Sequence, residues 1–114
     1  MHDGLSDLTA SALAALLQKS KLPVVVDFWA TWCQPCKVFA PAFKYAAKVL
    51  AGQVVFVKVD TDANAVVGAQ YRIRGVPTTI IFVDGVEKER QAGAAPPETF
   101  VQWLQTNLDL PRAA

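Results

Sequence analysis

The sequence predicts an α/β protein in which helices cover both faces of a central mixed sheet of four to five strands, as a three-layer α/β/α sandwich. Two observations favour this class. Apolar runs rich in β-branched residues, at positions 24–30 and 54–59, alternate with helical patterns, as parallel strands buried on both faces do. Near the C-terminus, Asp84-Gly85 separates two strand-like segments ahead of a last helical pattern, which indicates an antiparallel hairpin at one edge of the sheet.

The N-terminal part of the chain contains one amphipathic helix with its own start and stop signals. Apolar residues recur every three or four positions over residues 9–20, which is helical spacing. Asp7 or Thr9 offers a side-chain oxygen as the N-cap, and Pro23 ends the segment. A short strand at residues 5–8 would precede this helix, and it decides whether the sheet has four strands or five.

The central part predicts two strands with a long helix between them. Residues 24–30 are apolar apart from one acid, Asp27, and residues 54–59 are apolar apart from one base, Lys58. A helical stretch over residues 33–50 connects the two runs. Because sequential strands joined by a helix run parallel, both runs are expected in the middle of the sheet.

The C-terminal half predicts a short helix, a hairpin and a terminal helix. The short helix covers residues 63–71, and the hairpin pairs residues 78–83 with residues 86–91 across a two-residue turn. Pro96-Pro97-Glu98 opens the last helix, because proline fits the first helical turn. One face of that helix is apolar and consists of Phe100, Val101, Leu104 and Leu108.

Length and composition limit the classes of function. The 114 residues, 12.3 kDa, fit one domain over residues 1–114, which is long enough for a core without metal or disulfide staples. The 11 basic and 10 acidic side chains give a net charge of +1, which argues against a nucleic-acid binder. The longest apolar run, residues 12–17, is far shorter than the roughly 20 residues of a membrane span. No secretory signal is visible, so we expect the protein in the cytoplasm. We also expect it to be a monomer.

Cys33 and Cys36 are the residues most suited to chemistry. They lie where the first buried strand ends and a helix begins, which is the usual place for sites in open α/β sheets. The unpaired N–H groups and the dipole of that helix would stabilise a Cys33 thiolate, and Pro35 suits the first helical turn. Cys36, one turn inward, would lie deeper. We therefore expect an exposed attacking sulfur and a shielded resolving sulfur, as thiol–disulfide exchange requires.

Other roles for the cysteine pair are less well supported. A zinc site is nearly excluded, because the chain has no second cysteine pair and its only histidine is His2. Two buried structural thiols would not account for the flanking segment Trp-Cys-Gln-Pro-Cys-Lys. We therefore interpret the pair as redox-active and expect no metal.

Asp27 and Lys58 are charged residues within apolar strands. An ionised carboxylate is costly to bury among valine, phenylalanine and tryptophan, so burial would raise the pKa of Asp27. Since Asp27 lies on the strand that leads to Cys33, it could exchange a proton with Cys36. Lys58 would pair with Asp27 from the neighbouring strand, or it would extend to the surface without a catalytic part.

Aromatic and basic residues surround these elements. Trp29 is expected in the core, whereas Trp32, next to Cys33, is expected to be partly exposed as a contact for a partner. Four basic residues in the C-terminal half are predicted to form a solvated face: Arg72, Arg74, Lys88 and Arg90.

The segment Phe28–Lys37, followed by Ala40-Pro41, resembles the active-site signature of the thioredoxin family. Further positions along most of the chain match the same family, namely Asp27, Lys58, Asp60-Thr61-Asp62, Tyr71 to Thr78 and Gly93-Ala94. The resemblance implies a thioredoxin fold and a protein-disulfide reductase that works by dithiol–disulfide exchange. It also implies that Cys33 attacks a client disulfide, that Cys36 resolves the mixed disulfide, and that Asp27 and Lys58 assist.

The resemblance further implies the partners and the docking surface. A flavin-dependent thioredoxin reductase, fed by NADPH, would restore the dithiol, so the chain itself would bind no cofactor. Pro77 would follow a cis peptide bond and face the sulfurs, and the backbone of Val76 would pair with an extended client segment. The client surface would comprise Trp32, Gly75, Val76, Pro77 and Gly93.

One position departs from the family pattern and keeps two alternatives open. Gln34 replaces the glycine usual before Pro35, so Gln34 and Pro35 are expected to tune the redox potential. A thioredoxin-like oxidant or isomerase would result if Gln34 made the disulfide less stable. The other alternative is a binding module that uses the fold without redox turnover.

Overall fold

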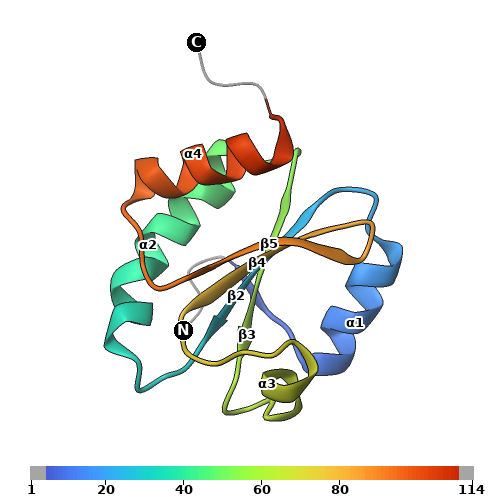
Figure 1. Ribbon diagram of the computed structural model, residues 1–114, viewed down its shortest axis with the longest axis vertical. Coiled ribbons are helices and arrows are strands. Elements are labelled where there is room, and N and C mark those ends of the chain that lie inside the picture. Colours follow the sequence, from blue (N-terminus) through green and yellow to red (C-terminus); the bar gives the residue numbers. More distant parts are fainter. Residues whose placement is uncertain (1–4, 111–114) are drawn as a thin grey trace.

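The computed structural model describes residues 5–110, and their elements follow the predicted order of strands and helices (Figure 1). The short strand ahead of the first helix is present, so the described residues form a sheet of five strands rather than four. In chain order the elements are β1 (Ser6–Asp7), α1 (Ala10–Lys19), β2 (Val24–Trp29), α2 (Gln34–Val49), β3 (Val55–Asp60), α3 (Val66–Gln70), β4 (Thr78–Val83), β5 (Val86–Ala92) and α4 (Pro97–Leu108).

The strands form one mixed sheet in the order β1-β3-β2-β4-β5. β1 and β2 run parallel to β3, whereas β4 runs antiparallel to β2, and β5 to β4. The connections β2–α2 and β3–α3 therefore leave from the same edge of the sheet, and β4 begins there as well, since Thr78 is the register partner of Phe28. The predicted α/β/α class is confirmed, and three connections meet at this edge.

Helices cover both faces of the sheet, with α2 and α4 on one side and α1 and α3 on the other (Figure 1). Alternate residues of each strand point to opposite faces, so Val25, Phe56 and Ile81 pack against the fully buried Phe43 and Phe100 of α2 and α4. Burying each such side chain contributes about 1.5–3 kcal/mol. The opposite core consists of Leu13, Leu17, Val24, Val26, Phe28, Val57, Val59, Val67, Ile80 and Phe82.

Local hydrogen bonds fix two element boundaries that the sequence left open or misplaced. Of the two candidate N-caps for α1, Thr9 is the cap, because its hydroxyl accepts the N–H of Ala12 at 3.1 Å. The helix α3 is shorter than the predicted 63–71, because the Asp60 carboxylate accepts the N–H groups of Asp62 and Ala63 and holds the chain there in turns.

The hairpin turn and the start of β4 have the backbone geometry that the sequence predicts. Asp84 and Gly85 have φ values of 53° and 78°, as a two-residue turn between twisted strands requires. The peptide bond between Val76 and Pro77 is cis, which confirms that expectation. Within residues 5–110, no helix has the length and apolarity needed to cross a membrane.

Candidate active site

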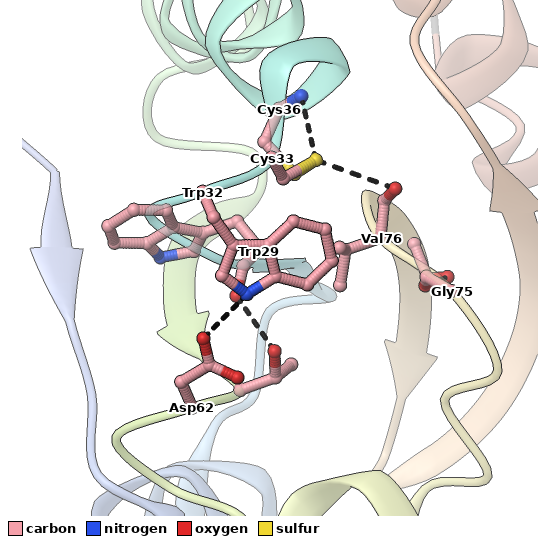
Figure 2. Close-up of a disulfide and its surroundings, with 9 residues drawn as sticks. Trp29, Trp32, Cys33, Cys36, Asp62, Gly75 and Val76 are labelled. Carbon is pink, nitrogen blue, oxygen red and sulfur yellow. Dashed lines mark hydrogen bonds between the residues drawn. A yellow bond between two sulfur atoms is a disulfide. The ribbon is translucent and has the colours of Figure 1, made fainter.

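Cys33 and Cys36 form a disulfide at the carboxyl edge of the sheet (Figure 2). The chain leaves β2 after Trp29, and Cys33 becomes the N-cap of α2, with Pro35 in the first helical turn. The Cα atoms of the two cysteines are 5.3 Å apart, within the usual range for a disulfide. The spacing of two residues at a helix start thus brings both sulfurs together, as the sequence predicts.

The Cys33 sulfur occupies the electrostatically favoured position at the helix start. It accepts the backbone N–H of Cys36 at 3.1 Å, and the first N–H groups of a helix have no partner inside the helix. The positive end of the helix dipole adds to this field. After reduction, these groups would favour a thiolate on Cys33 over a thiol.

The predicted difference in exposure between the two sulfurs is wrong for this disulfide form. Cys33 is 2% exposed and Cys36 is 4% exposed, so neither residue is the open one. Burial arises because both cysteines pack with Ala30 and contact Trp29 and Val76. Access therefore does not distinguish an attacking cysteine from a resolving one here.

The loop that carries the cis proline lies against the Cys33 sulfur. The carbonyl oxygen of Val76 is 3.6 Å from this sulfur (Figure 2), a distance at which a Cys33 thiol would donate a hydrogen bond after reduction. Gly93 adjoins the same loop, because its N–H donates to the carbonyl of Pro77 at 2.8 Å. The structure therefore brings together Gly75, Val76, Pro77 and Gly93, which lie far apart in sequence from Cys33.

A second loop, between β3 and α3, braces the segment before the cysteines. Trp32 is 69% exposed, as predicted, and its indole N–H donates to the Asp62 carboxylate at 2.7 Å. The backbone N–H and the hydroxyl of Thr61 donate to the carbonyl of Trp29 at 2.8 Å and 3.1 Å. The bond to Asp62 holds the exposed indole beside the disulfide (Figure 2), and the two bonds from Thr61 fix the end of β2.

Asp27 and Lys58 are buried side by side on the face of the sheet that α2 covers. They are register partners in neighbouring strands, and Asp27 is also the partner of Thr79 in β4. Asp27 is 1% exposed and Lys58 is 9% exposed, so the alternative in which Lys58 extends to the surface is wrong. The Lys58 ammonium instead lies 5.1 Å from the ring centre of Trp29, which is within cation–π range.

Asp7 is a member of this group that the sequence argument considered only as an N-cap. It is the register partner of Lys58 on the other side from Asp27, and its carboxylate accepts the indole N–H of Trp29 at 2.8 Å. Trp29 is consequently half-buried and tied to the edge strand, rather than a core residue as expected. The sequence signal was present as an acid between the apolar residues at positions 5 and 8, next to the expected short strand.

The basic residues of the C-terminal half do not all belong to a solvated face. Arg90 is partly buried, and its guanidinium bonds to the Glu87 carboxylate and to the carbonyls of Tyr71 and Arg72. The hydrogen bond from Arg90 lowers the pKa of Glu87 below its usual value. Arg90 thus fixes the segment that leads into the cis-proline loop.

No cluster in the described part of the chain offers three or more histidine, cysteine or carboxylate ligands for a metal. His2, which the sequence argument set aside as a ligand, lies outside the described residues.

The fold and the helix-start disulfide together define a thiol–disulfide oxidoreductase. Comparison with known families makes the assignment specific, because residues 5–106 match the family described as Thioredoxin. The chain therefore belongs to the thioredoxin family, and it is a protein-disulfide reductase.

Several curated relatives support this membership over most of their length. The chain is 44% identical over 90 residues to "Thioredoxin 1" of Synechococcus elongatus, and the aligned part covers 79% of this chain and 84% of the relative. It is 33% identical over 103 residues to "Thioredoxin" of Rickettsia bellii, and the aligned part covers 90% of this chain and 98% of the relative. It is also 37% identical over 102 residues to "Thioredoxin M-type, chloroplastic" of Spinacia oleracea, with 90% of this chain and 56% of the relative covered.

Proposed function

We propose that Cys33 is the attacking cysteine and Cys36 the resolving one. The Cys33 thiolate attacks one sulfur of a client disulfide, forms a mixed disulfide and releases the other client sulfur as a thiolate. The Cys36 thiolate then attacks the Cys33 sulfur and releases the second client thiolate. Two electrons pass from the dithiol to the client. The observation that carries this order is the N–H of Cys36 donated to the Cys33 sulfur, since it stabilises charge on that sulfur.

We propose that Asp27 accepts the proton of Cys36 before the resolving step, with Lys58 positioned to influence the Asp27 charge. Two facts support this role: Asp27 is buried on the α2 face, and Trp29, two residues further along the same face of β2, contacts the cysteines. Asp27→Asn keeps the shape of the side chain but removes the basic group. It should slow resolution of a mixed disulfide while leaving alkylation of reduced Cys33 unchanged; slowing of both steps would argue against the relay.

We propose that clients dock at Trp32, Gly75, Val76, Pro77 and Gly93. An extended client segment would form main-chain hydrogen bonds with the backbone at Val76, as a peptide strand does when it is added to an exposed sheet edge. The exposed indole of Trp32 supplies apolar contact area on the other side of the sulfurs. The contact between Val76 and the Cys33 sulfur supports this arrangement, because a client segment paired with the Val76 backbone would lie beside the attacking atom.

We propose that Gln34 and Pro35 tune the potential of the Trp-Cys-Gln-Pro-Cys-Lys active-site variant. Both residues are exposed in the first turn of α2. We further propose that electrons come from NADPH through a flavin-dependent thioredoxin reductase, and that the protein acts as a monomer in the cytoplasm. Residues 1–114 would work as a single domain.

Two experiments test the proposal. Insulin reduction, combined with equilibration against glutathione, separates a reductant from an oxidant and from a non-catalytic binding module. Cys36→Ser should accumulate a mixed disulfide with insulin on a non-reducing gel, whereas Cys33→Ser should accumulate almost none. Accumulation by Cys33→Ser instead would reverse the assigned order.

A further inference from the structure

We propose that a basic recess beside the cis-proline loop receives a carboxylate side chain of the client, so that the protein prefers disulfides flanked by acidic residues. This inference rests on the proposed docking of clients at Val76. The recess has a volume of about 620 Å³ and lies between the segment after α3 and strand β5. Its charged lining residues are Arg72, Arg74, Glu87, Lys88, Glu89 and Arg90.

A β-bulge shapes the strand side of this recess. Ile81 pairs with Glu89 and Phe82 pairs with Glu87, so the intervening Lys88 is an extra residue without a partner position in β4. The bulge shifts the alternation of side chains along β5. Glu87 and Arg90 consequently lie on the same face of the sheet, whereas regular alternation would place residues three apart on opposite faces.

The pair that results leaves a net positive charge in the recess. The Nε and Nη2 atoms of Arg90 donate to the two carboxylate oxygens of Glu87 at 2.6 Å and 2.7 Å, so these two charges cancel locally. Three cations and one carboxylate are left, from Arg72, Arg74, Lys88 and Glu89. Within residues 5–110, neither Arg74 nor Lys88 has an ion-pair partner. The recess therefore attracts a negative group.

The recess is continuous with the proposed docking backbone. Gly75 lines it, and the next residue is Val76, whose carbonyl lies 3.6 Å from the Cys33 sulfur. A hydrogen bond holds the loop over residues 75–78, since the Thr78 hydroxyl donates to the Gly75 carbonyl at 2.6 Å. An extended chain advances about 3.3 Å per residue, so a client segment along Val76 reaches Arg74 within about two to four residues of its own cysteine.

The occupant that fits is an aspartate or glutamate of the client. A carboxylate side chain can accept hydrogen bonds from a guanidinium and an ammonium at once, and opposite charge also accelerates encounter at low salt. One exposed ion pair is worth about 0.2–1 kcal/mol. A single acidic residue should therefore raise kcat/KM by up to about 5-fold.

The test uses two disulfide peptides that differ only in glutamate or glutamine, three residues from the attacked cysteine. Dithiothreitol regenerates the protein, so no reductase is needed. At low salt the wild-type protein should reduce the glutamate peptide about 2-fold to 5-fold faster in kcat/KM, and 0.5 M NaCl should remove the difference. The double variant Arg74→Gln/Lys88→Gln should lose the preference but reduce the glutamine peptide at the wild-type rate.

A matched control separates the recess from overall charge. Lys44→Gln/Lys48→Gln removes two exposed cations of α2, and the preference should persist in that variant. Equal loss in both double variants, or a preference that survives Arg74→Gln/Lys88→Gln, would overturn the inference. Equal reduction of both peptides by the wild type would overturn only the role proposed for the recess. Reduction of neither peptide would overturn the proposed docking at Val76 as well.

Discussion

Removing the Asp7 carboxylate tests how the edge strand supports the redox site. This carboxylate accepts the Trp29 indole N–H at 2.8 Å, and a hydrogen bond to a charged group is worth about 1.5–3 kcal/mol. Asp7 is exposed, so water competes for the bond and we expect about 1 kcal/mol. Asp7→Ala should therefore lower the free energy of unfolding by about 1 kcal/mol, or about 4 °C in Tm. Asp7→Asn keeps an oxygen acceptor and should lose less.

A double-mutant cycle isolates the bond from other effects of Asp7. Trp29→Phe removes the indole N–H but keeps an aromatic ring beside Lys58. Urea unfolding of the four proteins at pH 7 should give a coupling energy of about 1 kcal/mol between the two changes. A second cycle with Trp103→Phe is the control and should show additivity, since Trp103 packs against Phe100 in α4.

Additivity in this cycle would contradict a supporting role for the Asp7–Trp29 hydrogen bond. If Asp7→Ala and Trp29→Phe are additive within about 0.3 kcal/mol, the bond does not support the site. Reduced Asp7→Ala should still alkylate at Cys33 at the wild-type rate, because the N–H groups at the start of α2 are intact. A large loss of that rate would mean that the edge strand acts through the helix start, contrary to the contacts described.

Three further predictions concern the redox pair, the β5 strand and the core. Gln34→Gly should shift the redox potential by a few tens of millivolts, where about 30 mV corresponds to 1.4 kcal/mol; a wild-type protein more oxidising by over about 100 mV would contradict the reductase direction. Because Arg90 lowers the pKa of Glu87, Glu87 stabilises the fold above about pH 4.5 and loses this effect as the pH falls through its folded pKa. Glu87→Gln should thus cost up to about 1 kcal/mol at pH 7 and almost nothing at pH 2 in urea unfolding, and an equal cost at both pH values would reject the ion pair. Phe43→Ala should cost about 3–5 kcal/mol in the same assay, because the ring is fully buried against Phe56 and Phe100; a cost below about 1 kcal/mol would mean that the core collapses into the space.

Much of the fold follows from short-range patterns that physics makes unambiguous. A run such as residues 24–29 is typical of a central strand buried on two faces, and the Asp84-Gly85 turn determines the hairpin register next to the turn, up to the pair Phe82–Glu87. The start of α2 was predictable as well, since Pro35 fits a first-turn position, where its missing N–H costs nothing. These elements were predictable because each depends on residues close together in the chain.

The parts of the site that the sequence argument missed depend on register between distant strands. Asp7 belongs to a strand of two residues, too short for a periodic signal, and only its pairing with β3 brings it next to Lys58. The bulge at Lys88 has the same origin. Regular alternation along β5 would place Glu87 and Arg90 on opposite faces, so their ion pair could not be inferred from the sequence Glu-Lys-Glu-Arg alone.

The roles proposed for the two cysteines therefore depend on charge rather than on access. Exposed fractions of 2% and 4% leave no difference that a partner could use. The two sulfurs differ in their surroundings. The Cys33 sulfur accepts a helix N–H and lies beside the Val76 carbonyl on the proposed docking loop. A negative charge that forms on reduction is thus stabilised at the same atom that a docked client would meet. Because the charge stabilisation comes from the helix start and the docking position from the cis-proline loop, both would persist when a client docks against Trp32, and the order of attack would be kept.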